Sequence, residues 1–160
     1  NIFKKNKNIS FKIIGSGSES YKIKNLIKKK KLANIIYKSQ MNFNGIKKEY
    51  KNTDVLIAIL KRHSLSKKTI PSKVQAYMST GKPILCCIEG EATFLIQKAN
   101  CGFTCKNDID SIKKVIKKIN FTNKKKLNIL GKNGRNYFLN HFSSNIITLK
   151  LDEILKHLNE

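Results

Sequence analysis

Short apolar runs alternate with longer helical patterns along this sequence, and that alternation limits the possible folds more than any other feature. The apolar runs cover residues 11–14, 34–38, 54–60, 83–88 and 101–104. Between and after them, apolar residues recur with helical spacing at 20–31, 45–51, 72–80, 91–99, 109–119, 124–140 and 143–158. Strands that alternate with helices are typical of an α/β domain with a parallel sheet.

The runs 54–60 and 83–88 are apolar on both faces, which indicates interior strands of a sheet that helices cover on both sides. Pro71 fits the first turn of the helix expected at 72–80, and Gly81 fits its end. We therefore predict a Rossmann-like, doubly wound parallel sheet with C-terminal helices. With 160 residues, 40% of them hydrophobic, the chain is expected to form one domain over 1–160.

The net charge is strongly positive, but the types of basic residue argue against nucleic-acid binding. The formal net charge is +23, but the sequence holds 31 Lys, only 2 Arg and 18 Asn. Proteins that read bases or clamp phosphates favour Arg, and single-strand binders place aromatic side chains among their basic residues. Solvated helix faces in a Lys-rich proteome are the favoured interpretation. Attraction to an anionic membrane surface stays open.

The cysteine and hydropathy patterns bear on metal binding and on the cellular location. Cys86 and Cys87 lie in an apolar run, and Cys101 and Cys105 flank a Gly-Phe-Thr stretch, so no zinc-binding spacing is present. Buried or half-buried free thiols in a reducing compartment are expected. No signal peptide or run of about 20 apolar residues is found. The expected location is cytoplasmic, with the inner face of the membrane as a peripheral option. Because residue 1 is Asn, we expect an upstream portion.

Two loops at the expected carboxyl ends of strands have a composition that suits phosphate or base contacts. The first is Gly15-Ser16-Gly17-Ser18-Glu19. A dinucleotide fingerprint needs a third glycine, and Ser20 stands in its place, so a plain tight turn is equally acceptable here.

The second loop is the polar stretch 61–70, which runs into Pro71, Ser72 and Lys73 at a helix start. A hydroxyl, an ammonium and unbonded backbone amides together suit a pyrophosphate. On the residues alone, a helix cap at Ser72 and a solvated charge at Lys73 are the simpler alternative.

The segment TIPSKVQAYMSTGKPILCCIEGEATFLIQKANCGF, residues 69–103, resembles the C-terminal half of GT-B-fold glycosyltransferases of family 4. Within that family it is most similar to the N-acetyl-L-fucosamine transferase branch, which carries IPSK-x-QAYM-x-x-GKPIL, a GE loop and a CG strand. The flanking segments FKIIGSGSE, NIIYKSQMNFNGIKKEYKNTDVLIAIL and GKNGRNYFLNHFS resemble family segments too, so nearly all 160 residues are covered.

The resemblance implies a hexosyltransferase that takes its sugar from a nucleoside-diphosphate donor, such as a UDP-N-acetyl amino sugar. The acceptor would be a glycan or polyprenyl-linked molecule in bacterial surface polysaccharide synthesis. This half would bind the donor nucleotide, without a metal or other cofactor. The strand and basic loop that precede this region in the family, and the N-terminal acceptor domain, would lie upstream, so the fragment alone is expected to be inactive.

By the same resemblance, individual residues acquire roles. Lys73 and Glu91 would be catalytic, Lys73 at the diphosphate and Glu91 near the donor sugar, although a first-turn Glu91 matched to the helix dipole explains that residue equally well. The expected nucleotide-binding residues are Gly15, Ser16, Gly17, Tyr37, Lys38, Ser39, Ser72, Lys73 and Gln75.

The sequence departs from the family at one pair of positions. Two glutamates eight residues apart should fall at Lys68 and Ala76, and neither is acidic. The QAYM branch shares this departure, and Gln75 is a candidate replacement for part of the ribose contact. A GT-B-like sugar-nucleotide epimerase and a basic nucleic-acid-binding module remain as alternatives. Nucleic acid is not among the expected partners.

Overall fold

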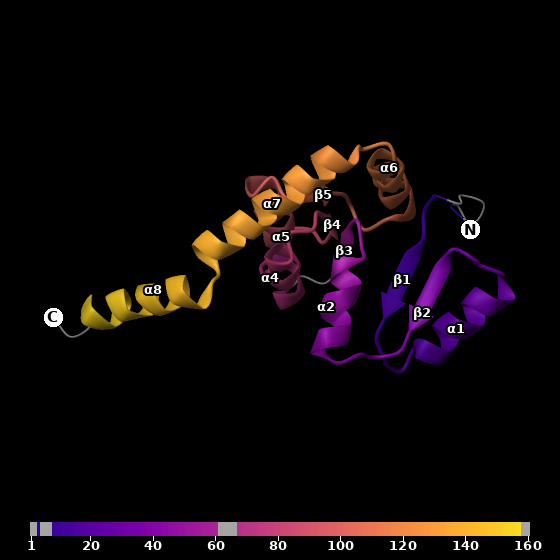
Figure 1. Cartoon of the computed structure of the whole chain (residues 1–160), viewed down its shortest axis with the longest axis horizontal. Coiled ribbons are helices and arrows are strands. Elements are labelled where there is room, and N and C mark those ends of the chain that lie inside the picture. Colours follow the sequence, from indigo (N-terminus) through magenta and orange to yellow (C-terminus); the bar gives the residue numbers. More distant parts are fainter. Residues whose placement is uncertain (1–2, 4–7, 61–66, 158–160) are drawn as a thin grey trace. The chain divides into compact units, whose positions relative to one another are not determined.

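The computed structural model describes residues 3, 8–60 and 67–157 of the chain (Figure 1). The chain divides into two compact units, Asn1–Glu49 and Tyr50–Glu160, and each contains a parallel sheet. The α/β class expected from the sequence is confirmed in both. The single nucleotide-sugar-binding domain expected over residues 1–160 stays a prediction.

The first unit is a β-α-β arrangement. Strand β1 (Phe11–Ile14) pairs in parallel with β2 (Ile35–Lys38), with Phe11 opposite Ile35. Helix α1 (Ser20–Lys29) connects them and ends in basic residues, which suits the negative end of its dipole. Helix α2 (Phe43–Lys51) follows β2 and crosses the boundary between the units.

The second unit holds a three-stranded parallel sheet in the order β3-β4-β5. Its elements are β3 (Leu56–Ile59), α4 (Ser72–Ser79), β4 (Ile84–Cys87), α5 (Glu91–Lys98), β5 (Gly102–Thr104), α6 (Ile109–Asn120), α7 (Lys124–His141) and α8 (Ser144–His157). Gly81 has φ +71 directly after the end of α4, so the expected glycine stop is confirmed.

Helices cover both faces of the second sheet, and β4 lies at its centre with every residue buried. One face packs on α4 and α5, through Val74, Met78 and Leu95 among others. The other face packs on α6 and the first half of α7, through residues such as Ile116 and Leu127. Figure 1 shows α4 and α5 on one side of β4 and β5 and α6 on the other. The two-sided cover that the apolar runs predicted is therefore present around β4.

The expectation that 54–60 is an interior strand is wrong. Strand β3 lies at an edge of its sheet, and only Leu56 and Ala58 are buried. Ile59, on the opposite face, is 49% exposed. Alternate residues of a strand point to opposite faces, and an apolar residue on each face shows only that both could be buried.

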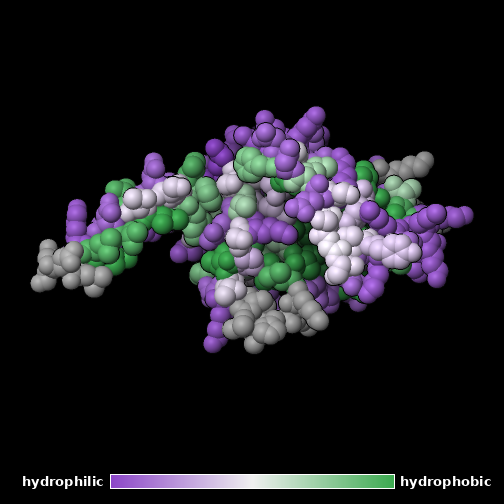
Figure 2. Space-filling model, turned by 90° about the horizontal axis from the view of Figure 1, so that it is seen from below, coloured by the Kyte–Doolittle hydropathy of each residue, from purple (hydrophilic) through white to green (hydrophobic). Residues whose placement is uncertain are grey.

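Helix α8 has an apolar surface that the described structure leaves exposed. Its residues Ile147, Leu151, Ile154 and Leu155 are about half exposed, and no residue of α8 is buried. Figure 2 shows apolar surface along this helix. Residue 158, which follows this helix, lies outside the described residues. Among the described residues, no helix is both long and apolar enough to span a membrane.

Candidate functional site

In the first unit, the turn after β1 is fixed by backbone and hydroxyl contacts. Gly15 has φ +149, and its N–H donates to the Lys38 carbonyl at 3.1 Å. The Gly17 N–H donates to Ser20 Oγ at 2.8 Å, and the Ser20 N–H donates back to the Gly17 carbonyl at 3.0 Å. These bonds hold the glycine turn at the start of α1, at the carboxyl end of the strand.

The space around this turn is open. A Cβ atom placed on Gly15 or Gly17 would meet no atom within 4 Å. The backbone angle of Gly15 already favours glycine. At Gly17 neither the backbone angle nor the packing requires a glycine. The absence of a side chain there therefore leaves the backbone accessible to a ligand.

Two side-chain contacts tie this turn to the end of β2 and to the residues that follow it. The Tyr37 hydroxyl donates to the Gly15 carbonyl at 2.6 Å, and Ser16 Oγ donates to Gln40 Oε1 at 2.7 Å. The Lys24 ammonium lies 5.0 Å from the centre of the Tyr37 ring, within cation–π range. The structure thus brings together Gly15, Ser16, Gly17, Tyr37, Lys38 and Ser39, as expected for adjacent parallel strands.

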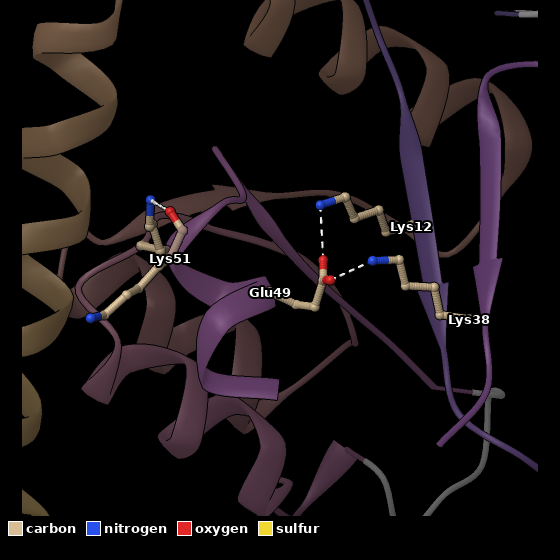
Figure 3. A network of polar contacts seen from close by, with 5 residues as sticks. Lys12, Lys38, Glu49 and Lys51 are labelled. Atoms are coloured by element: carbon tan, nitrogen blue, oxygen red, sulfur yellow. Dashed lines mark hydrogen bonds and ion pairs between the residues drawn. The ribbon is translucent and has the colours of Figure 1, made fainter. Parts of the chain in front are cut away.

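Lys38 takes part in an ion-pair cluster that the sequence did not reveal. Glu49 of α2 accepts from Lys38 Nζ at 2.5 Å and from Lys12 Nζ at 2.9 Å (Figure 3). Its side chain is 13% exposed. The hydrogen bonds from Lys38, and then those from Lys12, lower the pKa of Glu49 from 4.5 to about 2. The Lys38 side chain is therefore held against α2.

In the second unit, the start of α4 presents polar groups outward. Pro71 is the N-cap residue with extended backbone angles, and it offers no side-chain cap. Ser72 and Lys73 are exposed in the first turn, while the buried Val74 and Met78 anchor the helix to the core. Within residues 8–60 and 67–157, Ser72 Oγ and Lys73 Nζ make no hydrogen bond or ion pair. The cap expected as the simpler role of Ser72 is therefore absent there.

The start of α5 lies against the segment that leads into α4. A Cβ atom on Gly90, which has φ +88, would lie 2.0 Å from the Lys67 carbonyl oxygen. Lys67 Nζ also lies 3.5 Å from Glu89 Oε2. Glu91, the residue after Gly90, is exposed in the first turn of α5. The contact brings the loops after β3 and β4 together at the carboxyl edge of the sheet.

Each unit thus holds one group of the expected residues. Ser72, Lys73, Gln75 and Glu91 occupy the carboxyl edge of the β3-β4-β5 sheet, and Gln75 is half-buried on α4. The remaining expected residues form the two linked loops of the first unit. Most of the polar loop 61–70 falls on residues 61–66, outside the described residues.

Sequence reasoning missed the residues that hold these loops in place. Gln40, Glu49 and the Lys67–Gly90 packing have no signature in the sequence, because their partners lie far along the chain. Gly90 offered one signal, since a glycine just before a helix often marks a backbone angle that other residues avoid. Among the described residues, no group of three or more His, Cys, Asp or Glu side chains could hold a metal ion.

Comparison with known protein families shows to which family the chain belongs. The family described as "Glycosyl transferases group 1" matches residues 1–137. This chain belongs to that family. Comparison with curated proteins yields no match. The family match and the solved structures support the expected α/β fold, which is the C-terminal half of a GT-B enzyme. The N-acetyl-L-fucosamine transferase branch stays a prediction.

Several solved structures share the fold, and two of the three described next are glycosyltransferases by their descriptions. The chain superposes on a glycosyltransferase from Rickettsia africae ESF-5 with a TM-score of 0.76 and 20% identity, over 99% of this chain and 43% of that one. For HepE from Anabaena in complex with UDP, the TM-score is 0.73 and the identity 15%, over 93% and 41% of the two chains. For WaaG, a glycosyltransferase involved in lipopolysaccharide biosynthesis, the values are 0.66 and 17%, over 83% and 34%. This chain spans less than half the length of each.

Proposed function

We propose that this chain is the donor-nucleotide-binding part of a glycosyltransferase of the hexosyltransferase type. The donor is a nucleoside-diphosphate sugar, with a UDP-N-acetyl amino sugar as the specific candidate. The acceptor is a glycan or a polyprenyl-linked molecule of bacterial surface polysaccharide synthesis. The family match supports the reaction class, HepE in complex with UDP supports the nucleotide, and the lipopolysaccharide role of WaaG supports the pathway class.

The observation that carries the proposal is the start of α4. Two polar side chains, Ser72 and Lys73, are exposed there without partners in the described residues, at the carboxyl edge of a parallel sheet. The first amides of a helix lack intrahelical partners and carry the positive end of its dipole. A diphosphate supplies the acceptor oxygens and negative charge that such a position lacks.

In the proposed reaction, the bond between the anomeric carbon and the diphosphate breaks while the acceptor hydroxyl attacks. Negative charge builds up on the departing nucleoside diphosphate, and Lys73, Ser72 and the α4 amides stabilise it. An electrostatic donor of this kind contributes roughly 3 kcal/mol to transition-state stabilisation in well-studied enzymes. No metal or other cofactor is assigned a role, because these groups supply the positive charge.

Glu91 is the proposed contact to the donor sugar. It begins α5 next to Gly90, on the loop that packs against the segment leading to α4. A carboxylate in a first helical turn is favourably placed in the field of the helix dipole and can accept hydrogen bonds from sugar hydroxyls. Gln75, one turn into α4, is the proposed partial replacement for the missing ribose-binding glutamate at Ala76.

The glycine turn of the first unit is the proposed contact to the nucleoside. The open space at Gly17 admits a ligand close to the backbone. The end of β2 at Tyr37 and Lys38, with Ser39 after it, is the proposed source of backbone groups for the base, and the Tyr37 hydroxyl bonds this stretch to the turn. Backbone donors and acceptors read a base without the need for particular side chains.

The rest of the proposed enzyme supplies what these residues lack. An N-terminal GT-B domain of the same protein would bind the acceptor and provide any catalytic base. The proposed location is cytoplasmic, with peripheral contact to an anionic membrane through the Lys-rich helix faces. This contact would place the enzyme close to a polyprenyl-linked acceptor.

Titration of the whole protein with UDP, GDP and UDP-N-acetylhexosamines tests the donor site. The Lys73→Ala variant should bind UDP at least tenfold more weakly, because it removes a charged donor to the diphosphate. Lys98→Ala is the matched control, since Lys98 is exposed in the last turn of α5. That control should bind UDP as the unaltered protein does.

A random oligonucleotide serves as the competing ligand in the same experiment. If the oligonucleotide binds with an affinity that falls steeply with salt, and UDP shows no saturable binding, the donor-site assignment is wrong and the basic-module alternative replaces it. Equal loss of UDP affinity in Lys73→Ala and Lys98→Ala would also contradict the assignment, because it would reduce both effects to net charge.

A further inference from the structure

Two cysteines meet at the carboxyl edge of the second sheet. Cys87 is the last residue of β4, and Cys105 follows β5 directly. Their sulfur atoms lie 3.3 Å apart. The parallel register pairs Cys86 with Thr104, and the Cys105 N–H donates to the Cys86 carbonyl, so the ladder continues to the two cysteines.

This position meets the main geometric requirement for a disulfide. Neighbouring strands lie about 4.8 Å apart, and disulfides join residues whose Cα atoms are roughly 4.4–6.8 Å apart. The sulfur–sulfur separation would have to shrink to about 2.0 Å. Because Cys87 and Cys105 lie one step past the last paired residues, their side chains leave the sheet on the same face, beside Leu85 and Phe103.

The other two cysteines are placed differently. Cys86 and Cys101 belong to the core on the opposite face of the sheet, and both are fully buried. Their thiols donate to backbone carbonyls, Cys86 to Ile88 at 3.9 Å and Cys101 to Ile96 at 3.7 Å. The thiol contact that the structure describes therefore joins Cys87 to Cys105.

We propose that Cys87 and Cys105 form a redox modification site that closes into an intramolecular disulfide when the protein meets a small disulfide oxidant such as oxidised glutathione. The proposal does not depend on the sugar-transfer reaction. It assigns a reactive function to residues for which the donor site has no use.

The order of attack follows from exposure. Cys105 is partly exposed and Cys87 is fully buried, so the oxidant reaches Cys105 first. The Cys105 thiolate attacks one sulfur of oxidised glutathione, and one glutathione thiolate leaves. The Cys87 thiolate then attacks Cys105 Sγ, and the second glutathione leaves. Two electrons pass from the cysteine pair to the oxidant, and the two thiol protons end on the two glutathione molecules.

Burial raises the pKa of the Cys87 and Cys105 thiols, and this sets the speed of the reaction. Only the thiolate attacks a disulfide, so closure should be slow at neutral pH. Its rate should rise about tenfold for each pH unit below the thiol pKa. The contact with Cys87 opposes part of the effect of burial on the pKa of Cys105, which suits Cys105 as the first nucleophile.

The site is adjacent to the proposed donor loop in sequence. Cys87 precedes Ile88, Glu89, Gly90 and Glu91, and the new bond would join the carboxyl ends of β4 and β5. Oxidation would therefore restrain the point at which residues 88–91, which lead into α5, leave the sheet.

Prolonged incubation of the chain with oxidised glutathione at about pH 9.5, followed by thiol titration in denaturant, tests the proposal, because the thiolate fraction of thiols with a raised pKa grows with pH. The four cysteines should fall to two free thiols, and the mass should drop by about 2 Da through loss of two hydrogens. Fragmentation of proteolytic peptides should place the bond between Cys87 and Cys105, and dithiothreitol should reverse it.

Two variants separate this pair from the other thiols. Cys105→Ser, at a partly exposed position, should keep its three thiols or stop at a glutathione adduct, whereas Cys101→Ala should still lose two. If a variant fails to fold, the peptide map of the unaltered chain decides alone. Four thiols retained after prolonged oxidation at high pH, a bond between other cysteines, or bonds only between chains would overturn the proposal.

Discussion

At the scale of single residues, one carboxylate, that of Glu49, connects three elements of the first unit. It joins α2 to both strands of the first sheet through Lys12 and Lys38 (Figure 3). These strands are short, and a two-stranded sheet has little stability alone. We therefore expect contacts that connect the sheet to a helix to contribute more to stability than an ordinary surface ion pair does.

The lowered pKa of Glu49 predicts a specific pH dependence. The folded-state pKa of about 2 lies below the ordinary value of 4.5, so the stabilisation is present above pH 4.5 and is lost as the pH falls toward 2. Glu49→Gln should lower the melting temperature at pH 7 and flatten its decline in that acid range. Thermal unfolding followed by circular dichroism at several pH values measures both effects.

Glu19→Gln is the matched control for this prediction. Glu19 pairs with Lys22 at 2.9 Å, but both side chains are more than 60% exposed. Exposed pairs of this kind contribute about 0–1 kcal/mol, so the control should melt close to the unaltered chain. Equal effects of the two substitutions would show that Glu49 is an ordinary surface charge.

Two glycines with different surroundings give the second prediction at this scale. Gly90→Ala should cost about 2 kcal/mol or more, because φ is +88 and the new Cβ would overlap the Lys67 carbonyl. Gly17→Ala should change stability by less than about 0.5 kcal/mol, because its Cβ meets open space. Urea unfolding measures the stability difference.

UDP titration of the same variants gives a second readout. Gly17→Ala should weaken UDP binding by the whole protein although the fold is intact, because the methyl group enters the space assigned to the ligand. A Gly17→Ala variant with normal stability and normal UDP affinity would remove this turn from the proposed site.

At the scale of elements, α7 depends on two glycines that its own stability does not favour. Glycine in a helix interior costs about 1 kcal/mol relative to alanine. A Cβ on Gly131 would lie 2.0 Å from the Gly81 carbonyl oxygen, and one on Gly134 would lie 3.0 Å from Cys101 Cβ. The missing side chains let α7 pack closely on the turn after α4 and on the start of β5.

Gly131→Ala should therefore destabilise the second unit by about 1–3 kcal/mol, despite the gain in helix propensity. Lys132→Ala, at the next and exposed position, should be neutral within about 0.5 kcal/mol. Chemical denaturation of the two variants makes the comparison. A more stable Gly131→Ala chain would show that the close approach of α7 is not required.

The elements that sequence reasoning located well have local signals at their ends. Strand β1 was expected at 11–14 and lies there, because its apolar run stops at Gly15. Helix α4 was expected to end before Gly81, and it does. The position of β3 at a sheet edge and the contacts of Glu49 depend on pairing across many residues, which no local pattern records.

The candidate site divides in the same way. The family resemblance named Ser72, Lys73 and Glu91, and the structure places all three exposed at helix starts that follow strands of a parallel sheet. The link between the two loops of the first unit, through Tyr37 and Gln40, could not be predicted because it joins residues more than twenty positions apart.

At the scale of the whole molecule, the proposed donor site requires UDP to bind at defined helix starts and turns, with the large positive charge in a secondary role. The charge is spread over exposed lysines of many helices, which attract any anion weakly. A structured site instead protects particular backbone amides. The two explanations therefore predict different patterns of amide protection.

Hydrogen–deuterium exchange of the whole protein, with and without saturating UDP, tests this claim most directly. Binding at the proposed site should slow exchange in peptides that cover Gly15–Glu19, Ser72–Gln75 and Gly90–Glu91, with no change around the lysine runs at 28–31 and 124–126. Protection confined to those lysine runs, or no protection at the start of α4, would contradict it.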